Sequence, residues 1–508
     1  MKTGATRLSA EAAALLRRAA RLSPETSYLV GGAIRDAALG RPTADLDLAS
    51  ASPRSLAREL ARSLDAGLAV LDEENAVFRL VLGPAFKSVR QIDVAGLQGR
   101  SIAEDLARRD FTANAIALPL SPDLPERLSA GRFIDPRGGF ADIAKGILRS
   151  ESDSLIKEDP LRILRAFRLA AQLDFMIEPA TLSGISRLRQ LVTRPAGERI
   201  QAELLALLST AGASRWLRLM DEARVLTALF KELEAGRQCA LIYYGPGGVL
   251  SHSLETVDRA DFLLHRLDRV FPGERGAIEA FLKAQSRGAV PHAAVLMLAA
   301  LLHDIAKPET ARRVQGRLRF FGHDAVGAKR ASEVLKRLRF SREHSEAVSA
   351  VIANHLRPGN LAASGLVTDK AAYRFFRDLG EHAVSLLLVC WADHASYLPQ
   401  KLLLRCLAAA RAEPGDWNPS RRSLQRLPEE AKKTVHHLQV ISHLLRRGFD
   451  AENKPIPDKL IDGHDVMKAL GLPPGPRIGE LLEKVREAQA EGKVRTRAEA
   501  LKLLLKTQ

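Results

Sequence analysis

The chain has 508 residues and a formal net charge of +16, from 76 Lys and Arg residues against 60 Asp and Glu residues. This length provides for several domains with buried cores, and no apolar run approaches the about 18 residues of a membrane helix. Three widely separated cysteines, Cys239, Cys390 and Cys406, form neither a disulfide framework nor a zinc site and favour a reducing compartment. We therefore expect a cytoplasmic protein without a membrane partner, whose positive charge attracts nucleic acid.

The stretch from Tyr28 to Leu48 is the most informative part of the chain. Tyr28 to Val30 is a short apolar run that stops at Gly31 and Gly32, which predicts a strand followed by a tight turn. Two glycines allow the backbone to approach a ligand and to point its N–H groups at an anion such as phosphate. Arg35, in the short helix expected next, adds a positive charge.

Asp45 and Asp47 follow in the segment Ala-Asp-Leu-Asp-Leu. On a strand these two carboxylates share one face, while Leu46 and Leu48 point to the core. Alone, the pair also fits a solvated strand end. Just beyond a phosphate-binding turn, it indicates a site for a pair of Mg²⁺ ions that support in-line phosphoryl transfer.

Val30 to Asp36 followed by Asp45-Leu46-Asp47 resembles the nucleotidyltransferase motif of the class II tRNA nucleotidyltransferase and poly(A) polymerase family. The resemblance implies a polymerase-β-like head with a five-stranded type of sheet. In it Gly31, Gly32 and Arg35 would bind the triphosphate, and Asp45 and Asp47 would hold Mg²⁺. Asp93, on the expected strand from Val89 to Val94, is either a third carboxylate of this site or an ordinary strand-end residue.

A second motif, Arg-Arg-Asp-Phe-Thr-Ala-Asn-Ala, spans residues 108–115. Adjacent arginines and an aspartate offer phosphate clamps and an acceptor for a ribose hydroxyl. The motif resembles one of the same family, with Ala113 in place of the usual larger aliphatic residue. The resemblance places Arg109, Asp110 and Asn114 in the nucleotide site.

A third motif, Glu158-Asp159-x-x-Arg162, opens an expected helix in which Arg162, Arg165 and Arg168 form a basic ridge. Without the earlier motifs this helix would also fit an exposed, salt-bridged face. By resemblance, Asp159 and Arg162 act as an amino-acid template that accepts only CTP or ATP, and Arg165 joins the nucleotide site. The segment Gly197-Glu198-Arg199-Ile200 matches a further family motif to which we assign no role.

Histidines and aspartates recur across residues 213–400 in a His…His-Asp…Asp order. Imidazole and carboxylate together bind divalent metals. Their order resembles the HD phosphohydrolase superfamily, and Leu-Leu-His-Asp-Ile-Ala-Lys, which ends at Lys307, strengthens the resemblance. We predict a working phosphohydrolase that uses Mg²⁺, Mn²⁺, Co²⁺ or Ni²⁺; the alternative is a body that only supports tRNA. A resemblance to bacterial CCA-adding enzymes that carry this domain implies 2′,3′-cyclic phosphates and 2′- or 3′-phosphomonoesters as its substrates. The predicted ligands are His252, His303, Asp304, His323, His355 and Asp393.

Pro- and Gly-containing breaks at 413–415 and 453–457 separate a tail whose segment 463–479 resembles the end of bacterial CCA-adding enzymes. Within this tail Thr496 to Glu499 forms a predicted capping box. The expected fold is an α+β head, an all-α neck, an HD body and a helical tail. We place their boundaries at residues 1–150, 151–212, 213–410 and 411–508.

The predicted reaction is transfer of CMP and AMP from CTP and ATP to the 3′ end of tRNA, with release of pyrophosphate. Basic helices of neck, body and tail would grip the tRNA backbone. A poly(A) polymerase, or an enzyme that adds only A or only C, is the nearest alternative. An HD phosphohydrolase with a degenerate head and a non-catalytic RNA scaffold are alternatives of other classes. The sequence indicates no protein partner.

Overall fold

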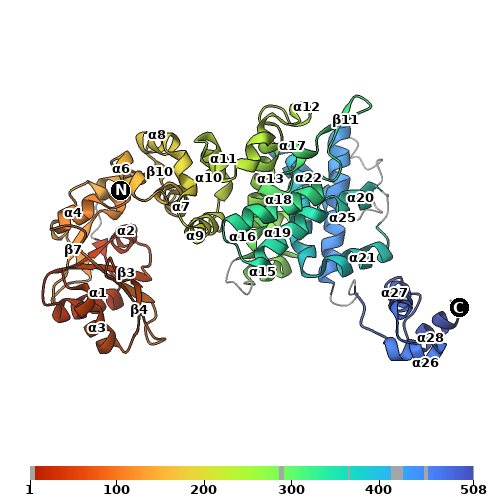
Figure 1. Ribbon diagram of the computed structural model, residues 1–508, viewed down its shortest axis with the longest axis horizontal. Coiled ribbons are helices and arrows are strands. Elements are labelled where there is room, and N and C mark those ends of the chain that lie inside the picture. The colour runs from red at the N-terminus through yellow and green to blue at the C-terminus, as the bar shows by residue number, and fades with distance from the viewer. Residues whose placement is uncertain (1–5, 285–290, 364–366, 413–426, 451–455, 507–508) are drawn as a thin grey trace. The chain divides into compact units, whose positions relative to one another are not determined.

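The computed structural model describes residues 6–284, 291–363, 367–412, 427–450 and 456–506 (Figure 1). The chain forms two compact units, one made of residues 1–203 with 220–229 and the other of residues 204–219 with 230–508. The first unit contains the large sheet and the second is mainly helical, as expected for an α+β head followed by helical domains. None of the helices in the described ranges combines the length and the hydropathy of a membrane span.

The first unit is built on a mixed sheet with the strand order β4-β5-β6-β3-β2-β7. Among the hydrogen-bonded neighbours in this sheet, β3 and β6 pair in parallel and the other pairs are antiparallel. The six strands are β2 (Ser27–Val30), β3 (Asp45–Ser50), β4 (Gly67–Asp72), β5 (Val77–Val81), β6 (Gln91–Gly96) and β7 (Ala117–Pro119). The sheet has six strands, whereas the resemblance implies a five-stranded type. The edge strands β4 and β7 are the two for which no separate strand was expected, and the residues of β4 are mostly exposed.

Two helices show how local sequence directs packing onto this sheet. Helix α1 (Ala10–Leu22) begins after Ser9, because the Ser9 side chain accepts a hydrogen bond from the Ala12 amide. Helix α3 (Pro53–Leu64) buries Leu56 and Leu60 and packs against β3, β4, β5 and β6. Full burial of a Leu side chain contributes roughly 1.5–3 kcal/mol, so this apolar stripe fixes α3 to one face of the sheet.

Helix α2 (Gly32–Ala38) directly follows β2, and helices α6 (Asp153–Glu158), α7 (Arg162–Leu173) and α9 (Gly197–Leu208) follow the sheet in the chain. Helix α7 buries an apolar stripe that includes Leu164 and Phe167. It begins after Pro160, because Asp159 is extended and separates α6 from α7.

The second unit is built around two helices that are buried on nearly all sides, α16 (His292–Leu302) and α22 (Ala383–Ser396). Their sequences show little helical amphipathicity because every face meets another helix. The helices that position the histidines and aspartates are α13 (Gly248–His265), α16 (His292–Leu302), α18 (His323–Arg337), α19 (Arg342–Asn354) and α22 (Ala383–Ser396). Helix α25 (Glu429–Phe449), in the range predicted for the tail, packs against α22, α20 (Arg357–Ala363) and α23 (Gln400–Ala410).

The last helices, α26 (Gly463–Leu470), α27 (Pro476–Ala490) and α28 (Arg497–Leu505), share a small apolar core that includes Val466 and Val485. The predicted capping box is present at the start of α28, where Thr496 and Glu499 bond reciprocally to each other's backbone. The predicted break at 413–415 and residues 453–455 of the second break lie outside the described residues.

Candidate active sites

The first site lies where β3 and β6 run side by side. Their parallel register places Asp47 opposite Asp93, while Asp45 lies opposite Gln91. Asp45 is exposed and Asp47 half-buried, and the alternating residues Leu46 and Leu48 are buried, as the sequence predicts. Arg79 on β5 binds Asp93 with two hydrogen bonds, Nε to Oδ1 at 2.8 Å and Nη2 to Oδ2 at 2.7 Å. Asp93 therefore accompanies the carboxylate pair and is held by an arginine.

The three carboxylates repel one another in the protein alone. Burial and the neighbouring charge of Asp93 raise the pKa of Asp47 to about 6. The same two causes raise the pKa of Asp45. A divalent cation would relieve this repulsion, and carboxylate oxygens are the ligands that Mg²⁺ prefers. The site thus fits a divalent metal.

Gly31 shows why the turn after β2 requires glycine. Its φ is +75°, and an added Cβ would lie 2.9 Å from Oδ2 of Asp47 and 3.4 Å from Nη1 of Arg109. A side chain here would clash with the carboxylate and occupy space beside it. The backbone of the turn, at the start of α2, therefore lies directly against Asp47.

Arg35, which the resemblance places at the triphosphate, is bonded to other protein groups in the structure. It is buried, and its guanidinium donates to Oδ1 of Asn114 at 2.6 Å and to Asp36 at 3.0 Å. Asn114 in turn donates to Asp110, which also accepts a bond from Arg165 at 2.9 Å. Burial alone would raise the pKa of Asp110, but Arg165 and Asn114 outweigh it and hold the pKa below its usual value. Arg35, Asn114, Asp110 and Arg165 thus form one ordered network.

Next to this network lies a cavity of about 270 Å³ that brings together residues from the second and third motifs. Asp159 is fixed by Arg199, whose Nη2 donates to Oδ2 at 2.9 Å. Arg162 donates to the backbone carbonyls of Leu155 and Arg108 at 2.8 and 2.7 Å. The cavity is lined by Gln98, Asp105, Arg108, Arg109, Asp110, Asp159, Arg162 and Arg165.

The expected basic ridge on α7 is largely neutralised. Arg165 pairs with Asp110, and Arg168 pairs with Glu203 at 2.6 Å. The motif without an assigned role, at Gly197 to Ile200, supplies Arg199 to Asp159. Sequence spacing did not reveal this pair, because the two residues are forty positions apart.

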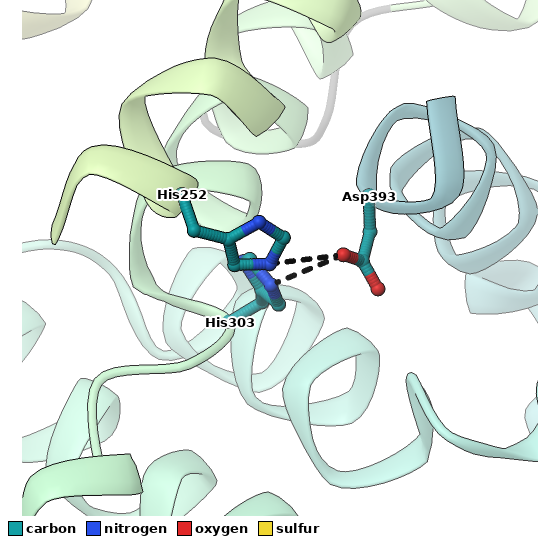
Figure 2. A group of neighbouring side chains, drawn as sticks. All are labelled: His252, His303 and Asp393. Carbon is teal, nitrogen blue, oxygen red and sulfur yellow. Dashed lines mark ion pairs between the residues drawn. The ribbon is translucent and has the colours of Figure 1, made fainter. Parts of the chain in front are cut away.

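The second site gathers all six predicted metal ligands. Nε2 of His252 and Nε2 of His303 lie 3.1 and 3.7 Å from Oδ1 of Asp393 (Figure 2). A second group consists of Asp304, His323 and His355. Within each group the potential ligand atoms lie within 4.8 Å of one another. Oδ2 of Asp304 lies 3.2 Å from Nε2 of His303 and its Oδ1 lies 3.4 Å from Nε2 of His323, so Asp304 connects the groups.

The backbone orients three of the four imidazoles. Nδ1 of His303, His323 and His355 lies 2.6–2.9 Å from the carbonyl of the residue three positions earlier. Donation from Nδ1–H to that carbonyl leaves Nε2 as a lone-pair donor facing the cluster, the usual arrangement of metal-binding histidines. Burial lowers the pKa of His355 to about 4, which keeps this imidazole neutral, as a ligand must be.

Four buried atoms of this cluster find no hydrogen-bond partner among the residues that the structure describes: Nε2 of His252, Nε2 of His303, Oδ1 of Asp304 and Oδ1 of Asp393. Buried polar atoms without partners are costly and call for a specific explanation. Because all four converge on one point of the fold, they fit a site for divalent metal.

A cavity of about 470 Å³ opens onto this cluster. Lys307 bonds both Asp304 and the hydroxyl of Tyr244, and the ring of Tyr244 stacks on His252 with centroids 4.5 Å apart. Helix α25 supplies Lys433 and His437 to the cavity wall. Sequence reasoning missed Tyr244, Lys433 and His437; the basic run Lys-Lys-Thr-Val-His-His at 432–437 was the available signal.

Four family models match consecutive parts of the chain. A poly A polymerase head domain matches residues 27–149, and the "Probable RNA and SrmB- binding site of polymerase A" matches residues 174–236. An HD domain matches residues 249–410, and tRNA nucleotidyltransferase domain 2 matches residues 450–504. Fold and sites together define a nucleotidyltransferase joined to an HD domain, two domain types that depend on divalent metal.

Relatives of known activity match over nearly the whole chain. The A-adding tRNA nucleotidyltransferase of Deinococcus radiodurans is 32% identical, with 94% of each chain covered. The CC-adding tRNA nucleotidyltransferase of Geobacter sulfurreducens is 31% identical, with 99% of this chain and 96% of the relative covered. The chain belongs to the bacterial tRNA nucleotidyltransferase family.

Solved structures agree with this fold. The Thermotoga maritima CCA-adding enzyme complexed with tRNA is 20% identical with a TM-score of 0.62, covering 99% of this chain and 96% of the other. A CCA-adding enzyme in complex with CTP has the same identity and coverage, with a TM-score of 0.64.

Proposed function

We propose that this protein adds CMP and AMP to the 3′ end of tRNA to complete the sequence CCA. The observation that carries this proposal is the position of Asp47, which lies under the Gly31 turn, opposite Asp93 on β6, and beside Asp45 on the same face of β3. The RNA substrate is supported by the relatives, which are tRNA nucleotidyltransferases, and by the tRNA complex of the Thermotoga maritima enzyme.

In this proposal Asp45 and Asp47, with Asp93 beside them, hold Mg²⁺. Bound Mg²⁺ supplies positive charge to the triphosphate and to the attacking 3′ hydroxyl. The turn at Gly31 and Gly32 presents backbone N–H groups to the phosphates. Arg109 adds a cation that also offsets the charge on Asp47. Arg35 acts through Asn114 and Asp110, whose positions it fixes.

Asp159 and Arg162, on the cavity wall, select the nucleotide. One offers carboxylate acceptors and the other guanidinium donors, so together they can match the hydrogen-bonding edge of cytosine or adenine. Their own bonds to Arg199, Leu155 and Arg108 keep them in place before the nucleotide arrives. Such preorganisation raises selectivity because little order has to be created on binding.

A partial activity, A-adding or CC-adding, is the second candidate, favoured by the full-length relatives of those names. Three tRNA transcripts that end at the discriminator base, at C and at CC distinguish the candidates when each is incubated with each NTP. CCA addition extends all three transcripts, a CC-adding enzyme stops at CC, and an A-adding enzyme extends only the third. Asp47→Ala should abolish extension of every transcript, and extension at the wild-type rate would place the metal site elsewhere.

We infer a second activity for the HD domain, hydrolysis of 2′,3′-cyclic phosphates and phosphomonoesters with Mg²⁺, Mn²⁺, Co²⁺ or Ni²⁺. The observation in its favour is the convergence of six candidate ligands, among them four buried atoms that accept or donate no hydrogen bond within the described residues. A cation held there supplies Lewis-acid charge to a phosphate. Lys307 and Lys433 at the cavity wall add positive charge where the phosphate would lie.

Assays with 2′,3′-cyclic AMP and p-nitrophenyl phosphate, each with the four metals in turn, test this activity. Hydrolysis should disappear in Asp304→Ala while extension of tRNA continues, because the two sites belong to different units of the chain. If the wild type hydrolyses neither compound with any metal, the HD domain has a supporting role only.

A further inference from the structure

Strands β11 (Arg312–Val314, labelled in Figure 1) and β12 (Arg317–Arg319) form a hairpin. Four of the six strand residues are arginines, which is an unusual concentration of positive charge. Its turn residues, Gln315 and Gly316, have φ values of +48° and +73°, as a two-residue hairpin requires. Arg312 pairs with Arg319 across the strands, and Val314 pairs with Arg317. Residues directly opposite or two apart share a face, so Arg312, Arg317 and Arg319 lie on one face and Arg313 on the other.

No acidic side chain in the described part of the chain forms an ion pair with these four arginines. Within the described ranges, none of them makes an ion pair or a side-chain hydrogen bond, and all four are exposed. Arginines on neighbouring helices behave differently: Arg330 pairs with Glu309 and Glu333, and Arg342 pairs with Glu346. Like charges this close repel one another, and an anionic ligand would relieve that repulsion.

Exposed aromatic and apolar side chains adjoin the hairpin. Phe321, directly after it, is 68% exposed, and Tyr243 on α12 (Leu241–Tyr244) is 48% exposed. The hydroxyl of Tyr243 donates to the backbone carbonyl of Leu318 at 3.1 Å, which ties α12 to β12. Bases of single-stranded RNA stack on such aromatic side chains while arginines contact the phosphates.

The same surface leads into the HD cavity. Tyr243, Arg319 and Phe321 line the cavity together with the metal-ligand candidates Asp304 and His323. His323 follows Phe321 by two residues, so only Gly322 separates the exposed aromatic residue after the hairpin from a metal-ligand candidate. An RNA strand lying on the hairpin would therefore have its end close to the ligands.

We propose that hairpin β11–β12, with Tyr243 and Phe321, is a platform for single-stranded RNA that delivers a phosphorylated 3′ end into the HD cavity. This inference rests on the proposed HD activity for its readout of hydrolysis, but the platform itself is testable by RNA contact. The preferred substrate of the HD site is then an RNA terminus rather than a free nucleotide.

The test compares an eight-nucleotide RNA ending in a 2′,3′-cyclic phosphate with 2′,3′-cyclic AMP. In the double variant Arg312→Ala, Arg317→Ala, the ratio of kcat/KM for the RNA to kcat/KM for the mononucleotide should fall about tenfold. The slope of log(kcat/KM) for the RNA against log salt should become shallower by roughly 1.4, about 0.7 for each lost phosphate contact. Phe321→Ala should lower the same ratio at least about fivefold, since one base loses its stacking partner.

The matched control is Arg275→Ala, Arg342→Ala, which removes the same charge from two exposed arginines that are paired with Glu279 and Glu346. The control should keep the wild-type ratio. An equal fall in both double variants, or an unchanged ratio in the hairpin variant, overturns the platform. A loss of tRNA extension with unchanged hydrolysis of the RNA end also overturns it, because the hairpin would then hold tRNA for the nucleotidyltransferase.

Photo-crosslinking separates this inference from the HD activity itself. The probe is the same RNA with a 3′ phosphate and 4-thiouridine as its last base, incubated with the full chain. Crosslinks should map to the peptide that contains Phe321 and should disappear in the hairpin variant but not in the control. If the protein hydrolyses nothing, such crosslinks still support the platform. Their absence in the wild type overturns it whether or not the HD site is active.

Discussion

The negative charge of Asp47 destabilises the folded protein when no metal is bound. Burial and Asp93 raise its pKa to about 6, while Arg109 opposes the shift. A carboxyl whose pKa is raised in the folded state stabilises that state only when protonated, so this contribution is present at low pH and is lost as pH rises from about 4 to 6. At pH values above 6 this loss of stability persists unless a bound cation offsets the negative charge.

Asp47→Asn should therefore gain stability relative to the wild type as pH rises through this window. In EDTA, the difference in free energy of unfolding should shift in favour of the variant between about pH 4 and pH 6 and then stay level. Added Mg²⁺ should narrow the difference at pH 7, because only the wild type binds it well. Denaturant titrations at four pH values measure this, and a difference that is constant with pH contradicts the environment described for Asp47.

Arg199 positions Asp159 without lining the cavity. Arg199→Ala should free the Asp159 side chain and lower the preference for CTP and ATP over UTP by about five- to tenfold, since selectivity depends on a fixed hydrogen-bond edge. Single-nucleotide incorporation with each NTP provides the measurement. Arg187→Ala is the control, because Arg187 is an exposed arginine of the same unit that pairs with Asp153 instead. Equal selectivity in both variants would show that Asp159 needs no support.

At the scale of elements, α25 completes a site whose metal-ligand candidates all lie at least 36 residues earlier in the chain. It packs along α22, which carries Asp393, and places Lys433 in the cavity wall. The HD family model ends at residue 410, so this helix lies outside it. The cavity of this protein is thus shaped in part by a segment that the domain pattern does not include.

Lys433→Ala should raise KM for 2′,3′-cyclic AMP about tenfold, because a charged hydrogen bond to phosphate is worth about 1.5 kcal/mol or more. The bound-metal content should stay the same, since Lys433 is not a ligand. Lys432→Ala is the control: its side chain pairs with Glu429 and it is absent from the cavity lining. A loss of metal in Lys433→Ala would indicate that α25 supports the ligands themselves.

At the scale of the whole molecule, the net charge of +16 makes binding of a polyanion strongly dependent on salt. The Kd for tRNA should rise about 10- to 100-fold between roughly 50 and 200 mM KCl, as bound counterions are no longer released favourably. The Kd for CTP should rise far less, because one triphosphate engages few cations. Fluorescence anisotropy at several salt concentrations tests both, and parallel salt dependences would argue against an extended tRNA contact.

The sequence by itself was sufficient for the elements and motifs that depend on local spacing. Asp45 and Asp47 lie on one strand, and Thr496 and Glu499 cap one helix, because period and capping chemistry act over a few residues. The order of His252, His303, Asp304 and Asp393 likewise predicted one cluster, and the structure brings these residues together.

Only the tertiary structure decided which distant residues meet. It paired Arg199 with Asp159, buried Arg35 against Asn114, and placed Lys433 beside the HD ligands. Such contacts depend on how helices and strands pack, and side chains forty or more positions apart leave no periodic signal in the chain. The edge strands β4 and β7 were not predicted for a related reason: each is placed by its backbone pairing with a neighbouring strand, β5 or β2, and the residues of β4 are mostly exposed.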